Sequence, residues 1–482
     1  MGRRVGPDMS PEEFRKLGHQ LVDRIAAHME RMPSGPVKPD ETRSALLGVL
    51  RAERGLPETG ADAGALLDTA ANLLFDHSLF NGHPRFFGYI TSSPAPIGAL
   101  GELLASVVNQ NCGSSTLAPM ATEIEVQTVR WIAELIGFEG LPGGILVSGG
   151  NMANFVCFLA ARTAKAGPDI RKSGIDSRLV FYASTETHTW VQKAADLFGF
   201  GTDAIRWIPV DDCQRLQTAE LRRRIESDRA NGDRPFLVVG TAGSVSTGAV
   251  DPLHEIAAIC REHDLWFHVD GAYGAFAAAI PGAPDDLRGL SQADSVAVDP
   301  HKWLYAPLEA GCALVKRPDD LRNAFSYHPP YYRFGEETLN FVDYGLQNSR
   351  GFRALKVWLA LQQLGRTGYV DSMAEDMRLS RKLFDLVRVH PEFDALTQSL
   401  SIATFRYVPG ELRSKAGEPE TESALNRLNE EILERLEKSG RAFLSNAVIN
   451  GKYAMRACIV NFRTSDADID ALPDIIASLG RA

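Results

Sequence analysis

The chain has 482 residues, of which 44% are hydrophobic and 23% are charged, a composition typical of globular proteins and unlike that of disordered or collagen-like chains. Its formal net charge of −10 provides no broad positive field for nucleic acid. No apolar run approaches the roughly 18 residues of a membrane span, no secretion signal is evident, and the six cysteines lack metal-ligand spacing. We therefore expect a cytoplasmic, enzyme-sized protein with no metal, no nucleic-acid partner and no membrane segment.

Residues 1–94 are expected to form a helical segment. Ser10 and Glu13 have the spacing of a capping box, and apolar residues follow at helical intervals. Two further helical patterns cover residues 41–53 and 61–75. These helices have little core of their own, so we expect them to pack on the rest of the chain or on a second subunit.

From residue 143 onward, short β-rich runs alternate with helix-length amphipathic stretches. The runs cover residues 145–147, 179–182, 205–210, 236–239, 265–269, 295–298 and 312–315. Their spacing of about thirty residues is typical of βαβ units and predicts an α/β domain with a large, mostly parallel sheet over residues 95–370. A long helix beyond Gly365, strands near 402–408 and 453–462, and a final helix near 469–479 predict a small α+β domain over residues 371–482.

Reactive side chains follow several of these predicted strands, and ligands of parallel sheets bind beyond the carboxyl ends of strands. Gly150 and Asn151 open a helix after the first run, which suits a phosphate, while His188, Asp270 and Lys302 follow later runs. Taken singly, each has an ordinary structural explanation, such as a turn, a core histidine, a cap or a surface lysine. Together they match pyridoxal 5′-phosphate (PLP), which needs its phosphate anchored, its ring held, its nitrogen protonated and its aldehyde bound.

Three stretches of the chain carry a family resemblance. They are HPRFFGY at 83–89, HVDGAY at 268–273 and DSVAVDPHKW at 294–303. The chain resembles the group II PLP-dependent amino-acid decarboxylases over essentially its whole length, and among them the aromatic-L-amino-acid decarboxylases most. The resemblance implies the fold type I (aspartate-aminotransferase-like) architecture and a homodimer, with N-terminal helices wrapped around the second subunit and the site at the subunit interface.

The resemblance also implies a role for each strand-end residue. Lys302 would form the Schiff base with PLP, Asp270 would pair with the ring nitrogen, and His188 and Ala272 would cover the two ring faces. Asp299 stands where aromatic decarboxylases have an amide near the phosphate, so its carboxylate must point away or accept hydrogen bonds. The remaining cofactor-side positions are Gly150, Asn151, Ser244 and His301.

Residues 325–332 fall where the family has its mobile catalytic loop, whose tyrosine protonates the α-carbon after carbon dioxide leaves. Counting from Lys302 without a gap assigns this role to Tyr331, with the adjacent Tyr332 as the alternative. Both tyrosines could instead simply pack a proline-rich surface loop.

We predict that the protein decarboxylates an L-amino acid to the corresponding amine and carbon dioxide. An apolar wall of Phe86, Tyr89 and Ile90 favours an aromatic substrate, although these side chains could equally belong to the core. Arg85 keeps an acidic substrate possible. Asn111 and Gly113 fall where an aromatic decarboxylase has bulkier apolar residues from the partner subunit, which leaves a non-aromatic substrate open, such as an acidic or histidine-like amino acid.

Two other functions fit the same fold. Oxygen could react after decarboxylation to give an aldehyde, ammonia and hydrogen peroxide, but the presence of Tyr331 and His188 argues against this outcome. A non-catalytic member of the family could keep the fold for assembly or regulation, but the intact Lys302 and Asp270 argue against that reading.

Overall fold

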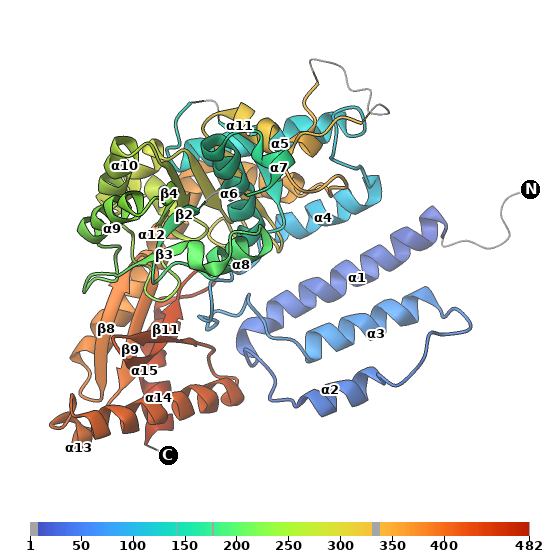
Figure 1. The fold of residues 1–482 in the computed structure, drawn as a ribbon. Coiled ribbons are helices and arrows are strands. Elements are labelled where there is room, and N and C mark those ends of the chain that lie inside the picture. The colour runs from blue at the N-terminus through green and yellow to red at the C-terminus, as the bar shows by residue number, and fades with distance from the viewer. Residues whose placement is uncertain (1–7, 141, 176–177, 330–337, 482) are drawn as a thin grey trace, which may run out of the picture.

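The computed structural model describes residues 8–140, 142–175, 178–329 and 338–481. Its first part consists of helices that extend away from the rest of the molecule (Figure 1): α1 (Pro11–Arg31), α2 (Arg43–Leu50) and α3 (Ala63–Asp76). The hydroxyl of Ser10 accepts the N–H of Glu13 at the start of α1, and Arg24 of α1 pairs with Asp68 of α3. The helical character predicted for this segment is thus confirmed.

The largest element is a seven-stranded sheet in the order β1-β7-β6-β5-β4-β2-β3. Neighbouring strands are parallel from β6 to β3, whereas β7 runs antiparallel to both β6 and β1. All strands but β7 therefore point the same way, which confirms the predicted mostly parallel sheet. The strands are β1 (Gly143–Val147), β2 (Leu179–Ser184), β3 (Ile205–Ile208), β4 (Arg234–Thr241), β5 (Trp266–Asp270), β6 (Ser295–Val298) and β7 (Gly311–Val315).

Helices cover both faces of this sheet, as a parallel sheet requires. Successive strand residues alternate between two cores: Ile145 and Val147 pack with α6, whereas Leu146 packs with α5. One face carries α6 (Gly150–Ala166), α8 (Trp190–Leu197) and α11 (Pro318–Phe325). The other carries α5 (Pro119–Leu135), α9 (Thr218–Ala230) and α10 (Leu253–Glu262). A short helix, α7 (Ile170–Ser173), follows α6.

The C-terminal part is a smaller α+β layer built on an antiparallel sheet in the order β10-β11-β9-β8. Its elements are β8 (Phe393–Ser399), β9 (Ile402–Tyr407), α13 (Gly410–Arg413), α14 (Pro419–Ser439), β10 (Ser445–Ile449), β11 (Lys452–Cys458) and α15 (Asp466–Gly480). The long helix α12 (Ala354–Val389) joins it to the large sheet domain and is interrupted at Gly365, whose φ is 66°. The domain boundary predicted between residues 370 and 371 thus falls inside α12, because one helix packs on both domains.

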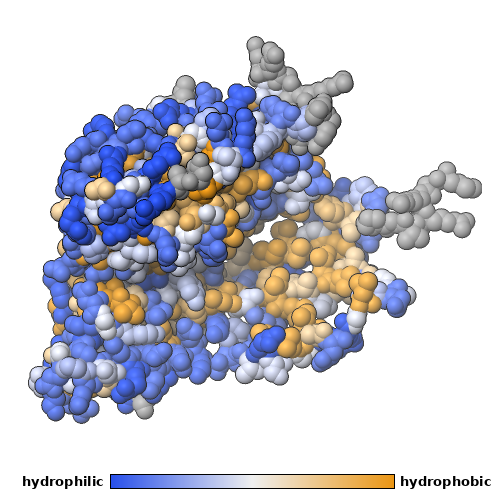
Figure 2. All heavy atoms as spheres, in the orientation of Figure 1, coloured by the Kyte–Doolittle hydropathy of each residue, from blue (hydrophilic) through white to orange (hydrophobic). Residues whose placement is uncertain are grey.

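An apolar surface remains uncovered on the side of the molecule where α1, α3 and α4 (Pro96–Val108) lie (Figure 2). Its exposed side chains include Phe14 of α1, Leu66 and Leu74 of α3, and, on α4, Leu100, Leu103, Leu104, Val107 and Val108. A contiguous apolar patch of this kind marks an interaction surface. Within the described part of the chain, no helix combines the length and apolar composition needed to cross a membrane.

Candidate active site

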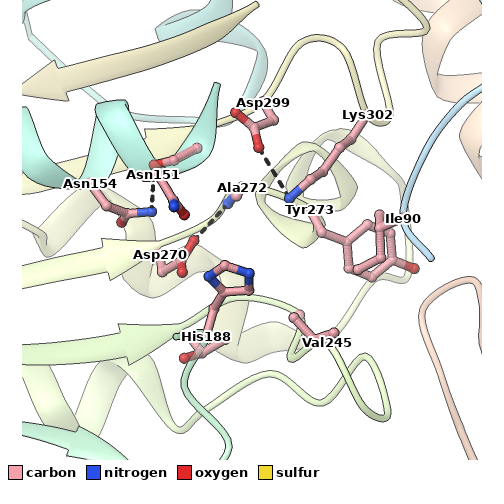
Figure 3. A pocket seen from close by; sticks show the side chains of 13 residues that line it. Ile90, Asn151, Asn154, His188, Val245, Asp270, Ala272, Tyr273, Asp299 and Lys302 are labelled. Atoms are coloured by element: carbon pink, nitrogen blue, oxygen red, sulfur yellow. Dashed lines mark hydrogen bonds and ion pairs between the residues drawn. The ribbon is translucent and has the colours of Figure 1, made fainter. Parts of the chain in front are cut away.

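A cavity of about 140 Å³ opens beyond the carboxyl ends of five strands of the large sheet (Figure 3). Each of the strands β1, β2, β4, β5 and β6 contributes residues at its end or just after it. The lining consists of Ile90, Gly150, Asn151, Asn154, His188, Thr241, Gly243, Val245, Asp270, Ala272, Tyr273, Asp299 and Lys302. The residues predicted from separate strand ends therefore meet in one pocket.

Lys302 lies in the tight turn that follows β6. Its backbone N–H donates to the carbonyl of Asp299, and its Nζ lies 3.1 Å from Asp299 Oδ2. The next residue, Trp303, is fully buried and donates from Nε1 to Asp376 of α12 at 2.9 Å. Tyr305 donates to the same Asp376 oxygen at 2.7 Å, so helix α12 holds the turn that presents the lysine.

Asp270 ends β5, and its carboxylate is held by two donors. Trp190 Nε1 donates to Oδ2 at 2.8 Å, and the backbone N–H of Ala272 donates to Oδ1 at 3.2 Å. Only 6% of the residue is exposed. A carboxylate fixed in this way can face a cationic group in the pocket without moving.

His188 lies across the pocket from Asp299 in Figure 3 and beside Asp270. Its Nδ1 accepts the backbone N–H of Trp190 at 3.2 Å, which leaves Nε2 to carry the proton of the neutral ring. Desolvation lowers the pKa of His188 below its ordinary value of 6.5, although the charge of Asp270 acts in the opposite direction. At neutral pH the ring is therefore an uncharged, flat surface on the wall of the pocket.

A buried hydrogen-bond network ties β5 to the first turn of α6. His268 Nε2 donates to Asn154 Oδ1 at 2.7 Å, and Asn154 Nδ2 donates to the carbonyl of Gly150 at 2.9 Å. Burial lowers the pKa of His268 to about 4, so this ring stays neutral. The network fixes the start of α6 relative to the strand that ends in Asp270.

The first turn of α6 approaches the pocket through backbone. Gly149 has a φ of 94°, a backbone conformation that residues other than glycine rarely adopt. At Gly150 there is no room for a side chain, because a Cβ there would lie 2.6 Å from Asp299 Oδ2. The backbone N–H groups of a helix N-terminus favour an anion. Two buried polar atoms on the pocket lining also lack hydrogen-bond partners, Thr241 Oγ1 and Asp299 Oδ1, which indicates that a polar ligand completes the site.

These groups fit PLP. The pocket offers an amine for an aldehyde at Lys302, a fixed carboxylate for a protonated ring nitrogen at Asp270, and flat or small surfaces for the ring faces at His188 and Ala272. The start of α6 suits the phosphate. Asp299 is the exception, since its charge opposes an anion.

Two predicted cofactor contacts lie behind the pocket wall. Ser244 is buried, and its hydroxyl is shared with Thr247 Oγ1 at 3.0 Å and with the N–H of Ala249 at 3.2 Å. His301 lies next to Pro307 in a separate cavity, and its Nδ1 donates to the carbonyl of Ala310 at 2.7 Å. Neither side chain lines the pocket described above.

Of the predicted apolar wall, the structure places Phe86 elsewhere and Ile90 at the pocket. Ile90 lines the pocket, but Phe86 is buried and stacked on Phe443 of the small domain, with ring centroids 5.4 Å apart. Tyr89 is 60% exposed on the surface of the single chain. The reason is that residues 86 and 87 are bound to the small domain through backbone contacts with Phe443, which turn the Phe86 ring into the interdomain core.

Tyr331 and Tyr332, the candidates for the loop acid, lie outside the described residues. Five lining residues received no role in the sequence reasoning, although Tyr273 lies in one of the stretches that carry the resemblance. They are Asn154, Thr241, Gly243, Val245 and Tyr273. Thr241 ends β4, and Gly243 and Val245 follow it, so the strand-end rule that identified the other residues could have assigned them to the site. No comparable sequence pattern predicts that Trp190 donates to Asp270, because this hydrogen bond depends on how the start of α8 packs against the end of β5.

The model of the pyridoxal-dependent decarboxylase conserved domain matches residues 51–408. An aromatic-L-amino-acid decarboxylase from Bacillus atrophaeus is 32% identical over 96% of this chain and 94% of its own, and a phenylacetaldehyde synthase from a Rosa hybrid cultivar is 29% identical over 94% and 90%. The crystal structure of Oryza sativa TDC with PLP and tryptamine superimposes with a TM-score of 0.91 at 26% identity, covering 99% of each chain.

The electrostatics of the pocket predict how His188 titrates. In the parent protein its pKa should lie below 6.5, and Asp270→Asn should lower it further, because the carboxylate that favours the imidazolium is then gone. The measurement is an NMR titration of the His188 ring resonances. Asp196→Asn, an exposed change on α8, serves as the control. A rise of the His188 pKa in the Asp270 variant would contradict this account.

Proposed function

The chain belongs to the pyridoxal-dependent decarboxylase family, and on this premise we propose that it converts an aromatic L-amino acid into the corresponding amine and carbon dioxide. It is a PLP-dependent carboxy-lyase that acts on amino acids. The observation that carries the more specific proposal is the meeting of Lys302, Asp270 and His188 in one pocket with an apolar side.

The predicted site residues receive the following tasks in this proposal. Lys302 binds the cofactor aldehyde, Asp270 holds the ring nitrogen, and His188 and Ala272 cover the ring faces. The backbone of Gly150 and the side chain of Asn151 receive the phosphate. Ser244 and His301, which do not line the pocket, keep only the cofactor-side assignment that the sequence resemblance gives them. When bound, PLP acts as the sink for the electron pair left on the substrate α-carbon.

Asp270 makes that sink effective because it keeps the ring nitrogen protonated. An ion pair near 4 Å at an effective dielectric of 20 is worth about 4 kcal/mol, which is nearly a thousandfold in rate. Trp190 and the N–H of Ala272 hold the carboxylate in place, so little reorganisation accompanies the reaction.

Two features favour an aromatic substrate. Ile90, Val245 and Tyr273 give the pocket an apolar side opposite the start of α6. The Bacillus atrophaeus relative is an aromatic-L-amino-acid decarboxylase and matches nearly the whole chain. Of the expected wall of Phe86, Tyr89 and Ile90, Ile90 lines the pocket of the single chain, and we propose that Val245 and Tyr273 complete its apolar side.

The protonation of the α-carbon is assigned to Tyr331 by its place in the sequence. A tyrosine hydroxyl that delivers this proton acts as a general acid, which contributes roughly 10²–10⁴-fold. The relative that forms phenylacetaldehyde provides the second candidate outcome, in which oxygen reacts before the proton arrives and an aldehyde results.

We also propose that two copies of the chain associate through the apolar surface on α1, α3 and α4 (Figure 2). Burying these side chains against a second copy would remove them from water at about 25 cal/mol per Å². The six free cysteines, five of them buried, suit the reducing cytoplasm in which we place the dimer.

The assignment of Lys302 predicts where the cofactor attaches. Borohydride reduction of the PLP-loaded protein should fix the cofactor on the peptide that contains Lys302, and the loaded protein should release carbon dioxide from phenylalanine, tyrosine or tryptophan. Lys302→Ala should lose both the label and the gas. Peptide mapping by mass spectrometry reads the label, with buried Lys356 as an internal reference. A label on another lysine would overturn the assignment, and gas from glutamate or histidine alone would overturn the aromatic substrate.

The assignment of Tyr331 predicts a change of product. Tyr331→Phe should slow protonation about 10²–10⁴-fold, so that less amine and new aldehyde and peroxide form in aerated buffer. Tyr332→Phe is the matched control and should still make mainly amine. The measurement is the amine-to-peroxide ratio of both variants and the parent. A shift in Tyr332→Phe alone would move the role by one residue, and no shift in either would remove it from this loop.

The proposed dimer predicts a dependence on α4. Leu104→Glu combined with Val107→Glu places two charges on the exposed apolar face and should convert dimers into monomers in analytical ultracentrifugation. Leu197→Glu, an equally exposed apolar position on α8, is the control and should leave the dimer intact. A parent protein that sediments as a monomer would refute the proposal.

A further inference from the structure

Asp299 is a buried carboxylate beside the N-terminus of α6. Only 1% of the residue is exposed, and a Cβ on Gly150 would touch its Oδ2 at 2.6 Å, so the carboxylate lies against the turn that suits an anion (Figure 3). Oδ2 lies 3.1 Å from Lys302 Nζ. Oδ1 is buried and has no hydrogen-bond partner. The charge of Lys302 thus balances the carboxylate at Oδ2, while Oδ1 accepts no hydrogen bond from the described residues.

Lys302 supplies the positive charge that faces Asp299. His301 Nε2 lies 3.8 Å from Oδ2, but burial lowers the pKa of His301, so the ring is neutral at neutral pH. Its one N–H group is at Nδ1 and donates a hydrogen bond to the carbonyl of Ala310, which leaves Nε2 without a proton on the side of the carboxylate. His188 is likewise kept neutral by desolvation. Among the described residues, Lys302 is therefore the one cation within 4 Å of this carboxylate.

Groups on the other elements packed around Asp299 do not offset the negative charge of its carboxylate. Asp270 on β5 is itself an anion, and burial, with a smaller contribution from Asp299, raises the pKa of the Cys312 thiol on β7 well above its ordinary value. Lys356 of α12 pairs with Glu102. The first residues of α6, Gly150 and Asn151, carry no charge.

Cofactor binding removes this balance. This inference rests on the function proposed above. In that function the ammonium group of Lys302 is lost when its nitrogen binds the aldehyde, and the phosphate brings further negative charge to the start of α6. An ionised Asp299 would then be a buried anion beside another anion, and like charges in contact disfavour the ionised form. An uncharged amide at this position would have no such conflict.

We propose that Asp299 takes up a proton at Oδ1 when PLP binds and donates it in a hydrogen bond to the phosphate. In this form the side chain is a neutral acid with the shape and donor of an amide. Lys302 must lose a proton before its amine can bind the aldehyde, and its Nζ lies beside Oδ2 rather than Oδ1. Lys302 would therefore release its proton to solvent, breaking an N–H bond, and Oδ1 would take one up from solvent, forming an O–H bond. Charge is conserved within the pair.

The experiment compares PLP binding to the apo forms of the parent and of Asp299→Asn. If Asp299 gains a proton on binding, the parent should take up about one proton more per site than the variant, so its Kd should rise up to tenfold more per pH unit. Titration calorimetry in buffers of different ionisation enthalpy counts the protons, and fluorescence gives Kd between pH 6.5 and 8.5. Asp228→Asn, a buried carboxylate that pairs with Arg206 away from the pocket, should behave as the parent.

The ³¹P resonance of bound PLP locates the proton. It should stay at the dianion position in both proteins, because the proton resides on Asp299. Equal proton counts for parent and variant would overturn the proposal, and so would a monoanion resonance in the parent alone, which would put the proton on the phosphate. Asp299→Ser provides a second variant without a carboxylate, expected to match Asp299→Asn in its proton count. Failure of PLP to bind or to label Lys302 would instead refute the proposed function.

Discussion

Five strands of the large sheet, β1, β2, β4, β5 and β6, run in the same direction, and the candidate site depends on this alignment. Because the strands are parallel, their carboxyl ends lie on one edge, and residues far apart in the chain meet there. Gly150, His188, Asp270 and Lys302 come from four different strand ends but line a single cavity. If one of these strands ran the other way, its residue would lie at the opposite edge of the sheet.

The alignment brings two carboxylates into the same pocket, and their surroundings differ. Asp270 has a donor on each oxygen, from Trp190 and from the backbone of Ala272, and can face a ring cation as an anion. Asp299 has a cation at Oδ2 and nothing at Oδ1, next to backbone that attracts a phosphate. Paired carboxyl groups in unlike environments commonly take different protonation states, and this is the distinction that we propose here.

The strand ends could be predicted from the sequence because each depends on a local pattern: an apolar run, then a turn, then a polar or glycine residue. The seven strands of the large sheet were found in this way, and so were Lys302, Asp270 and His188. The position of Phe86 could not be predicted, because its ring packs on Phe443 of the small domain, and no local pattern records that contact. Likewise, only the folded chain reveals that Trp190 reaches Asp270 and that α12 carries the carboxylate, Asp376, which anchors the Lys302 turn.

The central claim is that the strand-end residues form one cofactor site in which Asp270 keeps the PLP ring nitrogen protonated. The most direct measurement is the ¹⁵N NMR spectrum of the protein loaded with PLP labelled at that nitrogen. We predict a protonated nitrogen in the parent across neutral pH and an unprotonated one in Asp270→Asn under the same conditions. An unprotonated nitrogen in the parent, or no difference between the two proteins, would contradict the account.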